Sequence, residues 1–304
     1  MPPQADPTGA VVHERPPDYE TIAQRLKDGT IVPFFGAGAS VSCGLPAASD
    51  LARRLVQRAG FPDERGRDNL PLVASYLAQT QDLLTLKAEL REALAVQAEP
   101  GRLHRCLADP RLKNLRLFVT TNYDDLVERA LTARRPWVVV DRGDNSGTVW
   151  CRRHDGGPAG DWEEAEARTL RELLGSDPQR PIVLKLHGHF DRSDRDHDSF
   201  LITEEDYVDF LGRSEGSRIP PMLAATMRER SFLFLGYGLR DWNVRVLLHK
   251  LRQSRTRSGS IRSWAIVRRP GQAERQLWRA QDVEMLDVDV EAFAAELEAH
   301  LWPP

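Results

Sequence analysis

The sequence has few cysteines, no long apolar run and no excess of charge of one sign. Its three cysteines, Cys43, Cys106 and Cys151, are far apart and form no CxxC pair. They therefore predict neither a disulfide framework nor a cysteine-rich zinc site, and they favour a reducing cytoplasm. No apolar stretch approaches the roughly 20 residues that cross a bilayer. Residues 1–17 are polar and proline-rich without a secretion signal, and we expect a disordered lead-in there.

The charges are nearly balanced along the chain. Its 42 Lys and Arg against 45 Asp and Glu give a formal net charge of −3 over 304 residues. This balance argues against a protein that holds nucleic acid by bulk charge, but it leaves a local basic face open. A chain of this length can bury a large core. We expect residues 18–304 to form a single domain.

Apolar runs that alternate with helical patterns predict an α/β fold. The expected strands cover 31–35, 115–121, 137–140, 181–186, 231–235, 263–267 and 283–287. Because most of these runs are continuously apolar, they predict a Rossmann-like parallel sheet with helices on both faces. Successive helical patterns between two of the strands predict a helical module inserted at about 60–114. In segment 141–180 we expect a glycine-rich patch and one helix.

Helix boundaries are also readable at two places. Asp18 and Gly29 are expected to bound a first helix as N-cap and C-cap. Thr203 and Asp206 have the spacing of a capping box before a later helix. A helix is also expected directly after the glycine-rich segment 36–40, with its apolar side formed by Leu51, Leu55 and Val56.

Polar or glycine-rich clusters follow four of the expected strands. The first is GAGAS at 36–40, a turn that lets backbone N–H groups approach a ligand, with a helix N-terminus that favours a pyrophosphate. Asn122 and Asp124 follow the second strand, His187 follows the fourth, and 236–243 follows the fifth. Ligands of parallel sheets bind at the carboxyl ends of strands, so we expect one shared site.

Each cluster by itself also has a structural explanation. The turn can be a tight connection without a ligand, and Asp124 or Asp125 can cap the next helix in an Asx turn. We expect Asp125 to be the cap, which leaves Asn122 and Asp124 facing the site. His187 is either a structural histidine or a general base, because imidazole has a pKa near 6.5. Strand alternation places its competitor His189 on the same face.

Two charged segments are expected to be solvated surface. The first, DRSDRDHD at 191–198, has carboxylates and a histidine, but its spacing fits no known metal site. The second is a group of arginines within 252–269.

Five segments occur along the chain in a fixed order: GAGAS at 36–40, TTNYD at 120–124, KLHG at 185–188, ITEEDY at 202–207 and FLGYGLRDWN at 234–243. This is the order of the motifs in the sirtuin-like NAD-consuming family, and the chain most resembles its prokaryotic antiphage-defence branch. Each segment is common, whereas the ordered set is specific and covers most of the chain.

The resemblance implies an NAD site built from these segments, with NAD as substrate. Asn122 and Asp124 would hold the nicotinamide ribose, a water and the carboxamide, and His187 would be the general base. The residues that would contact the rest of the dinucleotide are Gly36, Ala37, Gly38, Ser40, Thr121, Gly236, Tyr237, Gly238, Asp241 and Asn243.

The chain also departs from the deacylating sirtuins. Residues 188–230 contain no cysteine, so the family's four-cysteine zinc module is missing, and we expect helices at about 190–230 and no metal. The family's Asp-Phe-Arg is Ala47-Ala48-Ser49 here, and its Asn near position 265 is absent. These losses fit an enzyme whose acceptor is water. The leading hypothesis is therefore an NAD⁺ glycohydrolase that releases nicotinamide and ADP-ribose.

The resemblance further implies a setting and a means of control. Unrestrained NAD⁺ hydrolysis kills a cell, so we expect a toxic effector of abortive infection that stays inactive until triggered. Control would come from a homo-oligomer or from a separate defence partner, such as a nucleic-acid translocase or an Argonaute-like protein. The alternatives are an NAD-dependent protein deacylase or ADP-ribosyl transferase, a non-catalytic NAD or ADP-ribose sensing subunit, and a nuclease that uses the 191–198 loop.

Overall fold

The computed structural model describes residues 18–141, 148–155, 161–166, 170, 179–212, 219–237, 245–246, 248–249, 251 and 261–303. The expected disordered lead-in at 1–17 and the glycines expected in a patch within 141–180 lie outside the described residues, as do Arg252, Arg255 and Arg257 of the arginine group within 252–269. Among the helices that the structure describes, none has the length and apolarity needed to cross a membrane.

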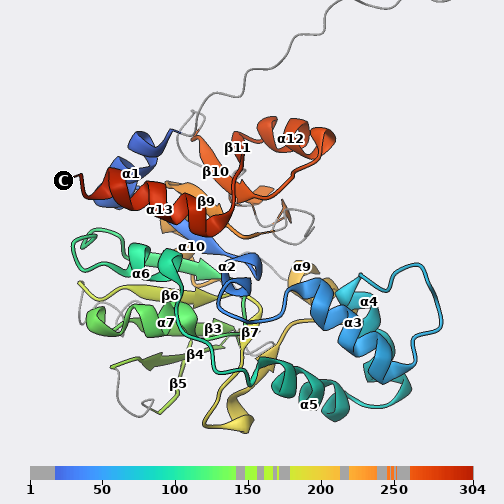
Figure 1. The fold of residues 1–304 in the computed structure, drawn as a ribbon. Helices are drawn as coiled ribbons and strands as arrows, with labels where there is room; N and C mark the ends of the chain where they lie inside the picture. Colours follow the sequence, from blue (N-terminus) through green and yellow to red (C-terminus); the bar gives the residue numbers. More distant parts are fainter. Residues whose placement is uncertain are drawn as a thin grey trace, which may run out of the picture.

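A nine-stranded sheet forms the centre of the described structure (Figure 1). The neighbouring strands from β11 to β3 pair in parallel, and β4 and β5 add an antiparallel edge. The predicted α/β class with a Rossmann-like parallel sheet is confirmed. In sheet order the strands are β11 (Val283–Asp287), β10 (Ser263–Val267), β9 (Ser231–Leu235), β1 (Ile31–Phe35), β2 (Leu117–Thr120), β6 (Ile182–Lys185), β3 (Trp137–Asp141), β4 (Thr148–Arg153) and β5 (Glu163–Glu166).

Strand β1 is central although it contains Pro33. Its pairing with β9 runs without a bulge over all five residues, whereas its pairing with β2 covers only Phe34 and Phe35. Backbone groups alternate between the two neighbours of a strand, and Phe35 accepts a hydrogen bond from Thr121 on the β2 side. The Pro33 nitrogen therefore also faces β2, below the paired residues, so the missing N–H interrupts no recorded pair.

Strands β4 and β5 correct the interpretation of segment 141–180, where the sequence predicted no strand. The signal was present in β4, because Val149 and Cys151 are buried while Trp150 and Arg152, which alternate with them, are half-buried. This alternation is typical of a strand with one covered face. Of the helix expected here, the described residues include only Leu170, which is buried.

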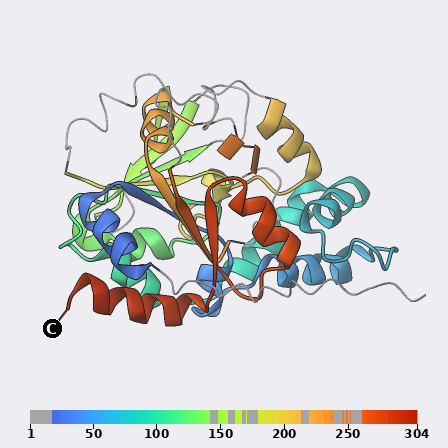
Figure 2. The ribbon, with the colours of Figure 1, turned by 90° about the horizontal axis from the view of Figure 1, so that it is seen from above.

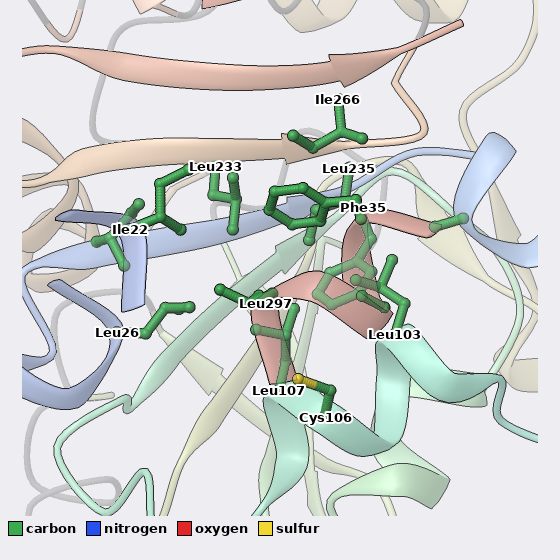
Figure 3. Close-up of a cluster of buried hydrophobic side chains, with 14 of the residues drawn as sticks. Ile22, Leu26, Phe35, Leu103, Cys106, Leu107, Leu233, Leu235, Ile266 and Leu297 are labelled. Atoms are coloured by element: carbon green, nitrogen blue, oxygen red, sulfur yellow. The ribbon is translucent and has the colours of Figure 1, made fainter. Parts of the chain in front are cut away.

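Helices cover both faces of the sheet, as predicted. Figure 2 shows α13 (Val290–Leu301), next to the C-terminus, together with α1 (Tyr19–Asp28) on one face. The shorter helices α6 (Arg102–Ala108) and α7 (Leu126–Ala130) add to the same layer. Figure 3 shows the resulting core, in which side chains of α1, α6 and α13 surround Phe35 and Leu233 of the sheet.

The opposite face has its own core. There α10 (Pro221–Arg228) contributes Leu223 and Met227, and α12 (Gln272–Arg279) contributes Trp278. These side chains pack against Phe34 and Phe234 of the central strands. Burial on both faces explains why the central strands have continuous apolar sequences.

The predicted boundaries of α1 are confirmed. The Asp18 side chain accepts a hydrogen bond from the Thr21 N–H at 3.1 Å, which satisfies one of the free donors of the first turn. Gly29 ends the helix with a φ of 67°, a left-handed conformation that glycine adopts without a Cβ clash.

A second, smaller core lies beside the sheet, where Figure 1 shows α3 (Ala48–Ala59), α4 (Leu70–Thr80), α5 (Leu83–Leu94) and α9 (Glu204–Gly212) together. Its buried members are Leu55, Phe61, Val73, Ala74, Leu77, Leu86, Leu90 and Ile202. Helix α6 instead packs on the sheet next to α13. The helical module thus includes α3 and stops at α5, which differs at both ends from the expected range of 60–114.

The segment expected to replace a zinc module has mixed structure. Along the chain it contains the 3-10 helix η2 (Arg195–His197), the strand β8 (Ser199–Phe200), and then the helices α9 and α10. Strand β8 pairs with β7 (Gly188–His189). The capping box at the start of α9 is confirmed. The Asp206 carboxylate accepts from the Thr203 N–H at 2.9 Å, and the Thr203 hydroxyl accepts from the Asp206 N–H at 3.1 Å.

Candidate active site

The glycine-rich turn leads from β1 into α2 (Gly38–Val41), which is a single helical turn. The longer helix α3 begins only at Ala48, so the expectation of one helix directly after the turn is wrong. A four-residue helix aligns few peptide dipoles, and the expected helix N-terminus for a pyrophosphate is correspondingly weak. Its backbone is also occupied, because the amides of Gly36, Gly38, Ala39 and Ser40 all donate to carbonyls of the protein.

Small residues are needed in this turn because the chain that follows β9 passes directly against it. A Cβ on Gly36 would lie 2.6 Å from Cδ2 of Tyr237, and one on Gly38 would lie 2.6 Å from the Gly236 carbonyl oxygen. Gly236 has a φ of +61°, and a Cβ there would be 2.1 Å from the Ala39 nitrogen. The first and last of the predicted clusters are therefore in contact, and the chain itself fills the space that the glycines leave.

Asn122, Ser40 and Asp124 form a directional chain of hydrogen bonds at the ends of β1 and β2. The Asn122 Nδ2 donates to the Gly36 carbonyl oxygen at 3.0 Å and to the Ser40 hydroxyl at 3.1 Å. The Ser40 hydroxyl donates in turn to Oδ2 of Asp124 at 2.9 Å. A carbonyl oxygen only accepts, so the amide nitrogen of Asn122 must face Gly36. The Asn122 Oδ1 is thereby the atom that can accept from a water or a hydroxyl of a ligand.

Asp124 uses both of its carboxylate oxygens inside the protein. Its Oδ1 accepts from the Leu126 N–H at 3.1 Å, which forms an Asx turn at the start of α7. Asp125 occupies the N-cap position, but its side chain makes no capping hydrogen bond, so the expected division of roles between Asp124 and Asp125 is wrong. Burial raises the pKa of Asp124, and the charge of Lys185 and the hydrogen bonds to the carboxylate oppose this rise.

Lys185 supports the same loop and was given no role by the sequence analysis. Its ammonium group donates to the Asp124 backbone carbonyl and pairs with Oε1 of Glu128 at 2.9 Å. The Lys185 and Glu128 side chains are only 1% and 4% exposed. A lysine at the end of an otherwise apolar strand was the available signal, because a buried charge needs a partner.

His187 lies after β6, the neighbour of β2, and is buried. Its ring meets the Tyr207 ring of α9 edge-on, with centroids 5.6 Å apart and an interplanar angle of 74°. The next residue, Gly188, has a φ of +86°, and a Cβ there would lie 2.0 Å from the Ser199 carbonyl oxygen. This turn breaks the strand alternation. His189 accordingly contacts Trp162 with centroids 4.5 Å apart, and its predicted placement on the same face as His187 is wrong.

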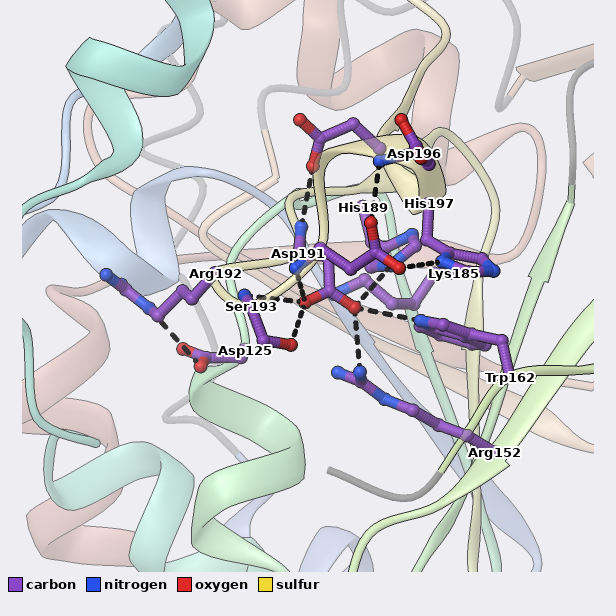
Figure 4. Close-up of polar contacts among 12 residues, drawn as sticks. Asp125, Arg152, Trp162, Lys185, His189, Asp191, Arg192, Ser193, Asp196 and His197 are labelled. Carbon is purple, nitrogen blue, oxygen red and sulfur yellow. Dashed lines mark hydrogen bonds and ion pairs between the residues drawn. The ribbon is translucent and has the colours of Figure 1, made fainter. Parts of the chain in front are cut away.

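The segment 191–198 is anchored at both ends in a buried polar cluster, shown in Figure 4, because Asp191 and Asp198 are buried. Between them Arg192, Ser193, Arg195 and Asp196 are exposed, so the predicted solvated loop is confirmed for the middle of the segment and wrong for its ends. Arg152 and the Trp162 indole each donate to Oδ2 of Asp191 at 2.8 Å. The other end is held by the ion pair of Asp198 with Arg91. In the described part of the chain, no group of three or more histidine, cysteine or acidic side chains has the arrangement needed to hold a metal ion.

The remaining predicted binding residues are distributed unevenly. Thr121 is half-buried, and its N–H donates to the Phe35 carbonyl. Tyr237 is buried, and its ring packs against Phe34 and Phe234 of the core. Half-buried Ala37 lies in the turn itself. Three further predicted residues lie outside the described part of the chain: Gly238, Asp241 and Asn243.

A protein-family model described as a SIR2-like domain matches residues 116–286, which is more than half of the chain. The chain belongs to the SIR2-like family. This confirms the sirtuin-like assignment that the ordered motifs predicted. The match includes the Asn122 loop, the His187 turn and the end of β9, but begins after the glycine-rich turn.

Several curated relatives of this SIR2-like chain have defence-related or NAD-related names. It is 24% identical over 241 residues to the NAD(+) hydrolase ThsA of Acinetobacter baumannii (strain 532279), covering 79% of this chain and 43% of that protein. It is 23% identical over 239 residues to Defense-associated sirtuin 2 of Bacillus subtilis, covering 76% of this chain and 20% of that protein. The SIR2-like chain thus spans less than half the length of these relatives.

Solved Sir2 structures are also similar to it. A Sir2 homologue in complex with NAD has 16% identity, 93% coverage of both chains and a TM-score of 0.46. A mutant Sir2 homologue in complex with ADP-ribose has 16% identity, covers 93% of this chain and 96% of that chain, and has a TM-score of 0.47.

Proposed function

We propose that this SIR2-like chain hydrolyses the N-glycosidic bond of NAD⁺ and releases nicotinamide and ADP-ribose. The observation that carries the proposal is the bonding of Asn122 to the glycine-rich turn, with His187 placed one strand away. Relatives named NAD(+) hydrolase support it. Asn122, Asp124 and His187 are the residues that we assign to the reaction.

The leaving group of this reaction needs no protonation. The nicotinamide ring is cationic in NAD⁺, so cleavage of the bond between the ribose C1′ and the ring nitrogen releases a neutral molecule without acid catalysis. The sugar then resembles an oxocarbenium ion, and oriented dipoles in a dry site stabilise it. One water enters, and nicotinamide, ADP-ribose and one proton leave.

Within this proposal the side chains have separate roles. The Asn122 Oδ1 would accept from the attacking water or from a ribose hydroxyl, since its Nδ2 is already committed. His187 would accept the proton directly or through a ribose hydroxyl. We assign Asp124 a positioning role, because its oxygens hold Ser40 and the start of α7. The residues that we propose to contact the dinucleotide are Gly36, Ala37, Gly38, Ser40, Thr121, Gly236, Tyr237, Gly238, Asp241 and Asn243.

The biological setting that we propose is antiphage defence in the cytoplasm. The name Defense-associated sirtuin 2 of one relative supports this setting. An NADase of this kind needs control, and we propose a homo-oligomer or a separate defence partner as its source. We propose the full activity for the chain within such an oligomer or complex. We propose no membrane as a partner.

The alternatives make different demands on the site. The sensing-subunit alternative is favoured by one observation, the internal use of the turn amides and of both Asp124 oxygens. A protein deacylase or ADP-ribosyl transferase would need an acceptor groove for a second substrate. Each alternative has its own product, so one assay distinguishes them.

The test follows nicotinamide released from NAD⁺ by the purified chain, with and without candidate partners. We expect Asn122→Ala and His187→Ala to lower the rate by about 10²- to 10⁴-fold, the usual size of a lost acid–base or positioning group. Matched controls are Asn114→Ala and His300→Ala, at exposed positions. Undiminished release in the site variants contradicts the assignment. Modified peptide products favour the transferase alternatives, and NAD⁺ binding without release favours the sensor.

A further inference from the structure

Three arginines gather at the amino-terminal edge of the sheet, opposite the candidate active site. Arg116 directly precedes β2, and Arg230 directly precedes β9. Only β1 lies between these two strands, so the two backbones are about 10 Å apart at the strand spacing of a sheet. Arg134, in the 3-10 helix η1 (Thr132–Arg134), donates from Nη2 to the carbonyl of Leu115 at 2.6 Å. That carbonyl belongs to the residue before Arg116.

Each of these arginines has a buried nitrogen without a hydrogen-bond partner. The atoms are Nε of Arg116, Nη1 of Arg134 and Nη1 of Arg230. Among the described residues, no ion pair involves any of the three. A buried donor left unpaired destabilises the folded chain, so three such donors at one edge are unusual for a purely structural cluster.

Neighbouring charges increase this imbalance. Burial, followed by the charge of Arg116, lowers the pKa of Arg134 to about 10 and also lowers the pKa of Arg230. A guanidinium group is not deprotonated in folded proteins, so the cluster carries positive charge. Asp109 is the carboxylate that acts on Arg134, and it already accepts hydrogen bonds from Arg111 at 3.0 and 2.7 Å. Within the described structure, the positive charge of the cluster is therefore compensated only in part, by the Asp109 carboxylate that Arg111 also uses.

We propose that Arg116, Arg134 and Arg230 bind the phosphate group of a small ligand, either a nucleotide or an inorganic phosphate. Guanidinium groups match phosphoryl oxygens in geometry and charge, and such a group offers several acceptors at once. The free donors then gain partners, and the repulsion among the arginines is neutralised. The compact, half-buried cluster and the net charge of −3 favour a small ligand over an extended nucleic-acid backbone.

This site is separate from the proposed NAD site. Strands β2 and β9 carry the arginines before their first residues, whereas Asn122 and Gly236 follow their last residues. A ligand at one edge therefore does not occupy the other. The inference does not depend on whether the chain hydrolyses NAD⁺.

Calorimetric titration of the full chain tests the proposal, with inorganic pyrophosphate and uridine diphosphate as probes, a nucleotide without the adenine of NAD. We expect Arg116→Gln and Arg230→Gln to weaken binding at least tenfold. The control is Arg153→Gln, an exposed arginine at the same edge, where Arg153 pairs with Trp137 at the start of β3. We expect less than a twofold change there.

Each result decides a point. Tighter binding of uridine diphosphate identifies a nucleotide, and equal affinity identifies the inorganic group as sufficient. An equal loss in Arg153→Gln shows diffuse surface charge and overturns the site, as does the absence of binding at physiological salt. Tight binding of a duplex oligonucleotide with the same arginine dependence, but no binding of either probe, also overturns the small-ligand proposal. Melting curves confirm that each variant is folded.

Discussion

The two edges of the parallel sheet differ in how far hydrogen bonds join their polar side chains, although Oε2 of Glu128 at the carboxyl edge also has no partner. At the carboxyl edge, Asn122, Ser40 and Asp124 are joined in one chain of hydrogen bonds, supported by Lys185. At the amino edge, the arginine cluster of Arg116, Arg134 and Arg230 keeps buried donors unpaired. A satisfied network holds its shape without a ligand, whereas an unsatisfied one gains hydrogen bonds only when an anion arrives. The comparison separates a preorganised site from a ligand-dependent one.

The largest effect is expected at the carboxyl edge, in Lys185→Met. This change leaves the Glu128 carboxylate buried without its cation and removes the hydrogen bond to the Asp124 carbonyl. Breaking one side of a buried ion pair costs about 3–5 kcal/mol, and we expect that loss in the free energy of unfolding. Denaturant unfolding measures it.

The matched control is the double variant Lys185→Met with Glu128→Leu. Removing both charges from the buried pair is expected to recover most of the lost stability, because no uncompensated charge remains. If the double variant is as unstable as the single one, the loss comes from packing and not from the ion pair.

An intermediate effect is expected from pH, through His189. Burial lowers the pKa of His189 to about 4, below the ordinary value of 6.5. Between these values the unfolded chain binds the proton and the folded chain does not, so stability falls as the pH drops from about 6.5 towards 4. The contribution is at most about 3 kcal/mol. Unfolding curves at pH 7 and pH 5 measure the part lost in that range.

His189→Phe isolates this contribution, because a phenyl ring keeps the contact with Trp162 and does not titrate. The variant is expected to lose less stability than the native chain between the two pH values. A remaining slope is expected from His104, whose pKa burial also lowers to about 4. Equal pH dependence of the variant and the native chain would assign the whole effect to other groups.

The smallest effect, and one of opposite sign, is expected at the amino edge. In Arg230→Gln the chain loses a charge that Arg116 repels and keeps a polar side chain at a half-buried position. Without added ligand we expect unchanged or higher stability, by up to about 1 kcal/mol, as is common when a functional site is relaxed. Thermal unfolding in a phosphate-free buffer measures it. A loss above about 1 kcal/mol would mean that Arg230 is already satisfied, and the contrast between the edges would fail.

Much of the fold was readable from local patterns. The apolar runs of β1 and β9, the Asp18 cap and the Thr203–Asp206 capping box depend on neighbouring residues along the chain, and the structure has them where the sequence placed them. The hairpin strands β4 and β5 were missed because an edge of the sheet buries only one face of a strand, which leaves a short alternating pattern.

The sequence predicted which residues belong to the candidate site better than it predicted what each side chain does there. Motif order and apolar strand ends indicated that the glycine-rich turn, Asn122 and His187 follow neighbouring strands, and the sheet order brings them to one edge. The division of roles between Asp124 and Asp125 depended on which carboxylate reaches the Leu126 N–H. The directions in which the His187 and His189 side chains point depended on the backbone turn at Gly188. Such geometry is set by tertiary contacts that a linear pattern does not contain.

The sequence by itself determined a Rossmann-like parallel sheet, its principal strands and its SIR2-like family, because apolar runs and ordered motifs are properties of the chain. Only the tertiary structure decided that the turn glycines serve a close contact with Gly236, and that Lys185 holds the Asp124 loop. It also decided that the arginine cluster shares one edge. The physical reason is that burial and hydrogen bonding depend on neighbours far apart in sequence, which only the folded sheet brings together.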